Sequence, residues 1–241
     1  MNKILLFLLG FFMIMSSCSP KISTSVSKKY ASLDYREDVL FLGFQDAEPA
    51  NAEQLGTVKI GDTGFTTDCG LETVIEKAKT EARKIGGNAI KLTKHTPPST
   101  LGSSCHRITA NILRIDNPKE YQEKLLALNS VSIGDNYALL HVYRTGGPGA
   151  LVSFDLHLGD KVICRVSNNW KETVKIDKDG LNTLWTRTET KTELPVNIKF
   201  GNEYYIRCSM GMGIFVGRPV LEIVNNQIGR IEFQSIAQKK K

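Results

Sequence analysis

The sequence has no apolar run long enough to span a bilayer, which excludes a protein with several membrane-spanning helices. Its longest run, Ile4 to Met15, has about 12 residues, whereas a spanning helix needs roughly 20. Hydrophobic residues make up 41% and charged residues 23%, so the chain is neither a disordered tail nor a collagen-like fibre. Its 241 residues suffice for one large domain or two of ordinary size.

Sequence motifs of the common catalytic sites are also missing. There is no Gly-x-Ser-x-Gly elbow, no P-loop, no His-Glu-x-x-His helix and no Cys-x-x-Cys pair. Gly211, Gly213 and Gly217 have the wrong spacing for a dinucleotide fingerprint, and they lead into Arg218-Pro219 and a strand rather than a helix. We therefore expect no catalysis, no metal and no small-molecule cofactor.

The charge balance is basic without being extreme. Lys and Arg number 31 against 25 Asp and Glu, which gives a net charge of +6. This excess permits contact with anionic surfaces but does not require nucleic acid, and we expect no nucleic-acid partner. The last residues, 236–241, are expected to form a solvated basic tail.

The first residues predict the compartment. Lys3 precedes the apolar run, the small residues Ser16 and Ser17 follow it, and then comes Cys18. This ending resembles the bacterial lipobox, in which the cysteine is lipidated and becomes the first residue of the mature protein. Met15 stands where the lipobox usually has Leu. The alternative is an ordinary secretory signal in which Cys18 is incidental.

We therefore expect residues 1–17 to be a lipoprotein signal peptide and Cys18 to anchor the mature chain to a membrane without spanning it. Ser19 follows the cysteine, and by resemblance to enteric sorting rules this favours the outer membrane. Residues 18–36 are rich in Ser, Thr and Lys without a sustained period, which is typical of a flexible tether.

Four further cysteines fall two in each half of the chain. An oxidising compartment favours disulfides, and three connectivities are possible. The simplest pairs Cys69 with Cys105 and Cys164 with Cys208. Each bridge would stabilise the fold by about 3–4 kcal/mol in the chain-entropy model.

Periodicity predicts a small α+β domain over residues 37–115. Short apolar or alternating runs at 38–44, 55–60, 88–92 and 105–115 are typical of strands. Between the second and third, apolar residues recur at three- and four-residue steps from Leu71 to Ile85, and Gly86-Gly87 ends this helix. The predicted order is β-β-α-β-β.

The run AKTEARKIGGNAIKL, from Ala78 to Leu92, resembles the small α+β domain of the Rcs envelope-stress sensor lipoprotein. Gly87, Asn88, Ala89 and the strand of Cys105 carry the resemblance, which covers about 80 residues. The Rcs domain is held by two disulfides, whereas this region has only Cys69 and Cys105, so the sensing role does not transfer. Asn88 is a weak binding candidate and is most simply a turn residue.

The rest of the chain predicts a connector and a second domain. Residues 116–135 are a connecting helix and linker, whose apolar stripe of Tyr121, Leu125 and Leu128 should dock on one of the two domains. Residues 136–235 predict an all-β antiparallel sandwich without helices, with its last strands near 219–224 and 229–234.

Four segments of this second domain resemble a β-sandwich domain of unknown function that recurs in bacterial lipoproteins. They are ALLHVYR, SFDLHLGDKVICRV, EYYIR and GIFVGRPVLEIV, in order over about 100 residues. The resemblance implies the fold and the compartment and leaves the activity open. Gly217 and Arg218 lie in the last segment and are weak binding candidates.

The sequence therefore predicts a lipid-anchored cell-envelope protein that acts by binding. Its partner would be an envelope protein, with the chain serving as an assembly component or as a stress-sensing adaptor. One alternative is an envelope hydrolase with a site built from His141, His157 and Asp155. Another is a purely structural spacer.

Overall fold

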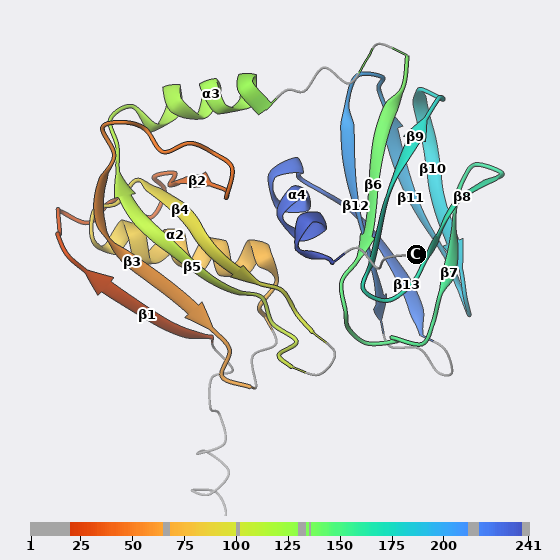
Figure 1. Cartoon of the computed structure of the whole chain (residues 1–241), viewed down its shortest axis with the longest axis horizontal. Coiled ribbons are helices and arrows are strands. Elements are labelled where there is room, and N and C mark those ends of the chain that lie inside the picture. The colour runs from red at the N-terminus through yellow and green to blue at the C-terminus, as the bar shows by residue number, and fades with distance from the viewer. Residues whose placement is uncertain are drawn as a thin grey trace, which may run out of the picture.

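The computed structural model of the chain describes residues 20–64, 68–99, 102–129, 134, 136–211 and 217–237. Cys18, the predicted signal peptide and residues 238–241 of the predicted basic tail lie outside these ranges. The fold is mixed α+β, mostly β, with three sheets (Figure 1). Within the described ranges, none of the helices combines the length and the apolar character needed to cross a membrane.

The first module is a five-stranded sheet with one long helix packed on it. Helix α2 (Leu71–Lys84) buries residues at three- and four-residue steps, among them Leu71, Val74 and Ala78. The sheet order is β1-β3-β5-β4-β2, built from β1 (Lys21–Val26), β2 (Leu40–Leu42), β3 (Glu53–Gly61), β4 (Ala89–Thr96) and β5 (Arg107–Arg114). Along the chain this module has the order β1-β2-β3-α2-β4-β5, and β1 is a strand that the sequence did not predict.

The additional strand shows that the predicted tether is wrong from residue 20 onward. Strand β1 pairs antiparallel with β3, from Lys21 opposite Gly61 to Val26 opposite Gly56, and Pro20 before it is buried. Residues 27–33 continue along the module through backbone hydrogen bonds to Leu55, Arg83 and Ile85. An edge strand buries little, so its polar Ser and Thr residues do not show the apolar alternation of an inner strand.

A helix after β5 docks on the first module. Helix α3 (Pro118–Asn129) places Leu125 and Tyr121 against Leu42 of β2 and Leu113 of β5. Ile112, the neighbour of Leu113, packs instead with α2. Since successive strand residues point to opposite faces, α2 and α3 cover opposite faces of the sheet.

The second module consists of two four-stranded sheets that share one hydrophobic core, and we call it the sandwich below. Its sheets have the orders β13-β12-β6-β9 and β11-β10-β7-β8. Strands β6 and β12 pair in parallel, as do β2 and β4 in the first module, so the expectation of an entirely antiparallel sandwich is wrong. The strands are β6 (Ala138–Arg144), β7 (Phe154–Leu158), β8 (Lys161–Val166), β9 (Trp170–Ile176), β10 (Gly180–Arg187), β11 (Lys191–Ile198), β12 (Glu203–Gly211) and β13 (Arg218–Val224).

A helix, α4 (Asn226–Ser235), replaces the strand expected near 229–234. The Asn225 side chain accepts a hydrogen bond from the Ile228 backbone N–H at 3.0 Å and caps the helix. Gly229 allows close approach to β12, because a Cβ there would lie 2.3 Å from the Cβ of Tyr205. Figure 1 shows α4 between the first module and the sheet that contains β12 and β6.

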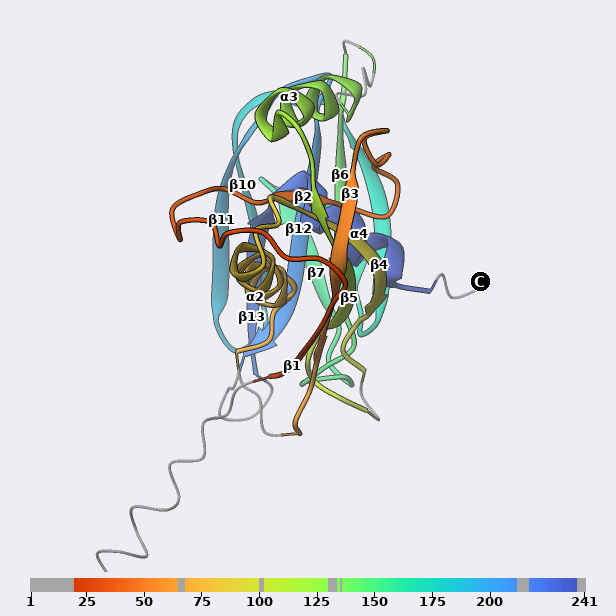
Figure 2. The ribbon, with the colours of Figure 1, turned by 90° about the vertical axis from the view of Figure 1, so that its left-hand side faces the viewer.

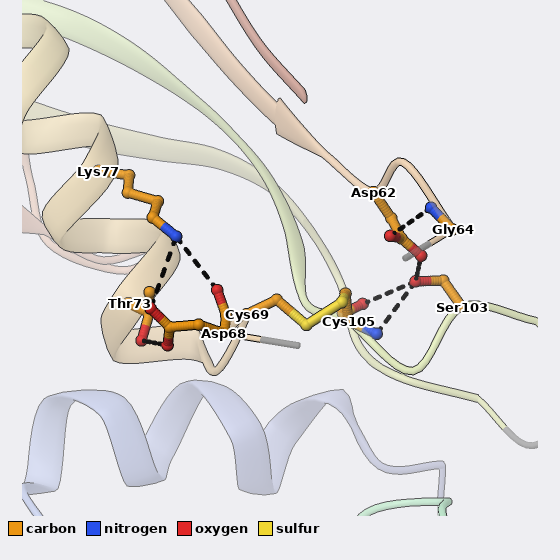
Figure 3. The surroundings of a disulfide bond; sticks show 8 residues. All are labelled: Asp62, Gly64, Asp68, Cys69, Thr73, Lys77, Ser103 and Cys105. Carbon is orange, nitrogen blue, oxygen red and sulfur yellow. Dashed lines mark hydrogen bonds and ion pairs between the residues drawn. A yellow bond between two sulfur atoms is a disulfide. The ribbon is translucent and has the colours of Figure 1, made fainter. Parts of the chain in front are cut away.

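One of the two predicted disulfides is present. Cys69 and Cys105 are bridged, with their Cα atoms 5.1 Å apart (Figure 3). Cys164 and Cys208 are free and buried, so the second predicted bridge is absent from the described structure. Burial raises the pKa of Cys164 to about 12 and also raises that of Cys208, so both are thiols. An unbridged cysteine also usually points into an apolar core, because it behaves as a small hydrophobic residue.

Candidate functional site between the two modules

A buried carboxylate lies at the centre of the junction. Glu232 of α4 is 1% exposed. Its Oε2 accepts a hydrogen bond from the Tyr143 hydroxyl at 2.6 Å and another from Arg207 Nε at 2.8 Å. Because Tyr143 lies on β6 and Arg207 on β12, this carboxylate fixes α4 to the sandwich sheet.

The Arg207 guanidinium connects the sandwich to the first module. Its Nη2 donates to Glu72 of α2 at 2.8 Å, and its Nη1 donates to Glu222 of β13 at 3.0 Å. Burial opposes the positive charge, but Glu232, Tyr143 and Glu72 outweigh burial and raise the pKa of Arg207. The cation is therefore held between three carboxylates from α2, β13 and α4.

Two histidines extend the contact toward the disulfide. His106 Nε2 lies 3.4 Å from Glu232 Oε1, and His106 Nδ1 shares a 2.8 Å hydrogen bond with His95 Nε2. The His106 backbone N–H donates to the carbonyl of Cys69 at 3.1 Å. We call His95, His106, Tyr143, Arg207 and Glu232 the junction cluster.

Burial sets the protonation of the junction cluster. It lowers the pKa of His95 to about 4. Burial, with smaller contributions from His95 and Arg207, lowers the pKa of His106 to about 3. Burial raises the pKa of Glu232, opposed by Arg207 and by the Tyr143 hydrogen bond. Both imidazoles are therefore neutral at neutral pH.

The contacts of the junction cluster form a fixed connection between the two modules. The cluster's buried polar groups bond one another, as buried polar groups must. Across the described ranges, no three His, Cys, Asp or Glu side chains are grouped so that they could hold a metal ion.

We expect the junction cluster to lose stability as the pH falls below about 6.5, because the unfolded chain accepts protons that the folded imidazoles resist. Their contribution is fully present above the unfolded pKa of 6.5 and is lost as the pH falls toward the folded values of about 4 and about 3. Glu232 attracts a proton to His106, whereas Arg207 repels it. Urea unfolding at neutral pH and at about pH 5 measures the loss.

The control for this prediction is the double variant His95→Gln/His106→Gln, which cannot gain these two charges. Its loss of unfolding free energy between the two pH values should be smaller than that of the unaltered chain. Equal losses in both proteins would contradict the assignment, whatever the starting stability of the variant.

A groove of about 1210 Å³ opens beside α4, toward α3 and the loop that follows β2. Its lining is mixed in character. Apolar side chains come from both modules and from α3, among them Phe41, Phe44, Leu125, Leu126 and Ile231. Charges of both signs also line it, including Arg36, Lys119 and Arg230 against Glu37, Asp46 and Glu123.

The loop after β2 forms one wall of the groove, and hydrogen bonds to both modules hold it in place. The Lys91 ammonium donates to the carbonyl oxygens of Gly43 at 2.7 Å, Phe44 at 3.1 Å and Asp46. Asp46 Oδ2 accepts from the Gly43 backbone N–H at 2.7 Å and from Gln227 of α4 at 3.1 Å. The wall is therefore connected to both modules before any ligand binds.

The three weak binding candidates do not come together. Asn88 lines the groove, and its amide clamps Ile115, donating to its carbonyl at 2.8 Å and accepting from its N–H at 2.9 Å. The Gly217 carbonyl accepts from the Thr188 hydroxyl at 2.8 Å. Arg218 is exposed at the start of β13, opposite Gly211 and away from the groove.

The residues of the alternative hydrolase site are divided between two sheets, with His141 on β6 and both Asp155 and His157 on β7. His141 Nε2 of β6 lies 3.3 Å from Glu203 Oε2. This hydrogen bond is the largest of the interactions that lower the pKa of the Glu203 carboxyl to about 2. His157 of β7 stacks on Trp185, with ring centroids 3.8 Å apart. Asp155 pairs with Arg165. The structure does not assemble these three residues into one site.

Sequence reasoning missed the junction cluster. Its members lie far apart in the chain and form no motif, and the one available signal was the helical spacing of Ile228, Ile231 and Glu232. Comparison with protein-family models, with curated proteins and with solved structures finds no match to this chain.

Proposed function

We propose that the chain is a lipid-anchored cell-envelope protein that acts by binding a protein partner, as an assembly component or a stress-sensing adaptor. In this proposal acyl chains on Cys18 hold it at the outer membrane, without catalysis, cofactor or nucleic acid. The lipobox resemblance at Met15–Cys18 supports the anchor. The Cys69–Cys105 disulfide fits an oxidising compartment, and the resemblances of both modules to lipoprotein domains agree with it.

The groove beside α4 carries the binding proposal. Its volume of about 1210 Å³ exceeds what most small ligands need, and its lining mixes apolar side chains with charges of both signs. Such a lining suits a polypeptide segment with apolar anchors and a polar rim. Lys91 and Asp46 hold one wall in place, so binding does not require that loop to become ordered first.

Photocrosslinking in intact cells tests this proposal, with matched probes at two exposed leucines. Leu126 of α3 lines the groove and is 66% exposed, whereas Leu181 of β10 lies on the sandwich and is 79% exposed. We expect one dominant protein adduct at Leu126 that is absent at Leu181. No adduct at Leu126, or the same adducts at both positions, would contradict a partner in the groove.

A structural spacer is the second candidate function, and the junction cluster favours it. Arg207 and Glu232 fix the modules together, as a spacer requires. A spacer would tolerate replacement of the groove lining, so the variant Leu126→Asp would leave the cellular phenotype unchanged. An adaptor would lose its crosslinked partner with the same variant.

A further inference from the structure

We propose that the loops at one end of both modules form a membrane-contacting face that rests on an anionic lipid surface. The face consists of Lys21, Arg107, Leu151, Arg187 and Arg218, and we call it the anchor-side face. Its placement rests on the proposed lipidation of Cys18, whereas its affinity for lipid is a property of the described residues themselves.

The chain between Cys18 and the fold is too short to hold the protein away from the bilayer. Pro20 is buried and Lys21 already pairs with Gly61 in the sheet. Two residue steps extend at most about 7 Å. An acylated Cys18 therefore brings the start of β1 to the headgroup layer and selects which end of the molecule faces it.

The register places these residues at one end of each module. In the first module, Lys21 lies opposite Gly61, and Arg107 opens β5 opposite Thr96. In the sandwich, this end holds the turn after Arg187 and the start of β13 at Arg218. Figures 1 and 2 show these turns at the lower end of both modules, where the chain enters β1.

The charge of this face suits anionic lipid. Lys21, Arg107, Arg187 and Arg218 make no ion pair with any carboxylate of the described residues, and all but the half-buried Arg107 are exposed. The nearby Asp62 accepts from the Ser103 hydroxyl (Figure 3). The bases are therefore free to meet phosphate groups, each adding about 1 kcal/mol, or roughly fivefold, to binding.

The loop after β6 presents an apolar side chain, Leu151, at the same end, because β6 runs parallel to β12 and ends beside it. Arg144 at the end of β6 is 2% exposed, yet its guanidinium donates to the carbonyls of Pro148, Gly149 and Val152. The loop that it holds presents Leu151, which is 101% exposed. A buried arginine thus fixes a loop whose tip leucine has no core to enter, which suits insertion among lipid headgroups.

Vesicle sedimentation tests the face without its anchor. The mature chain with Cys18→Ser is mixed with vesicles of phosphatidylcholine and phosphatidylglycerol, or of phosphatidylcholine alone. We expect binding to the anionic vesicles only, weakened by salt. The double variant Arg187→Ala/Arg218→Ala should weaken this binding about 25-fold, at roughly fivefold per base. Leu151→Ser should weaken it as well.

The matched controls lie at the opposite end of the sandwich. Lys178 follows β9, Lys199 follows β11, and Leu181 is the second residue of β10. Lys178→Ala/Lys199→Ala and Leu181→Ser should leave vesicle binding unchanged. Equal effects at both ends, or no binding of the Cys18→Ser chain to anionic vesicles, would overturn the proposal.

Palmitate labelling of the full-length chain in cells separates this proposal from the proposed function. If Cys18→Ser abolished the labelling and the chain did not bind vesicles, the lipid anchor would be supported and the anchor-side face would be refuted. If the chain bound vesicles but was not labelled, the anchor-side face would be supported and the lipidation of Cys18 would be refuted. In reconstituted membranes, Leu151→Trp fluorescence should be quenched by brominated lipid more than that of Leu181→Trp, and equal quenching would contradict the orientation.

Discussion

Replacement of Glu232 by alanine is expected to lower the free energy of unfolding by about 3–5 kcal/mol, the usual cost of removing one partner of a buried ion pair. Arg207 would lose its buried counter-charge, and the Tyr143 hydroxyl would lose its acceptor at 2.6 Å. Urea unfolding of the unaltered chain and the variant measures the difference.

The matched control is Glu222→Ala, which removes a second carboxylate from the same guanidinium. Glu222 bonds Arg207 Nη1 at 3.0 Å, but its side chain is largely exposed, so its loss should cost less than about 1 kcal/mol. A Glu222→Ala effect as large as that of Glu232→Ala would show that burial is not the reason for the stabilisation.

The Glu232→Ala variant should also change the shape of the unfolding transition. Glu232 and Arg207 connect α4, the sandwich and α2, and the core that surrounds them contains residues of both modules. With this connection weakened, the two modules are expected to unfold in two steps instead of one. Since α4 lines the groove, a partner that requires both walls would be lost in the same variant.

The fold was predictable from hydrophobic periodicity where an element buries one face against its own module. Helix α2 shows this, because its buried residues repeat with the helical period and the Gly86-Gly87 pair follows its end. Strand β1 and helix α4 were missed for opposite reasons. Strand β1 buries too few residues to show apolar alternation. In α4, Ile231 and Phe233 alternate as they would in a strand, although Asn225 caps a helix there.

The candidate site was not predictable because long-range packing creates it. Of the four histidines, His141 and His157 received the functional interpretation, whereas His95 and His106 form the bonded pair. Arg207 meets Glu72 across 135 positions of the chain. No local pattern encodes such a contact, and only the docking of α4 between the modules brings it about.

Removal of the Cys69–Cys105 bridge by the double variant Cys69→Ala/Cys105→Ala is the second large expected effect. The bridge closes a loop of 36 residues. In the chain-entropy model its loss lowers the free energy of unfolding by about 4 kcal/mol. The bridge also joins the segment before α2 to the segment before β5 (Figure 3). The second of these segments includes His106, which meets Glu232.

Cys164→Ala/Cys208→Ala provides the matched control, since it also removes two buried sulfurs but no bridge. Its cost should be about 1 kcal/mol, typical of a small truncation in a core. Reductant should destabilise the unaltered chain and this control alike, because both keep the Cys69–Cys105 bridge, and it should leave Cys69→Ala/Cys105→Ala unchanged. If reductant destabilised the latter, Cys164 and Cys208 would be bridged in the isolated protein. The sandwich core would then hold a covalent connection between its two sheets.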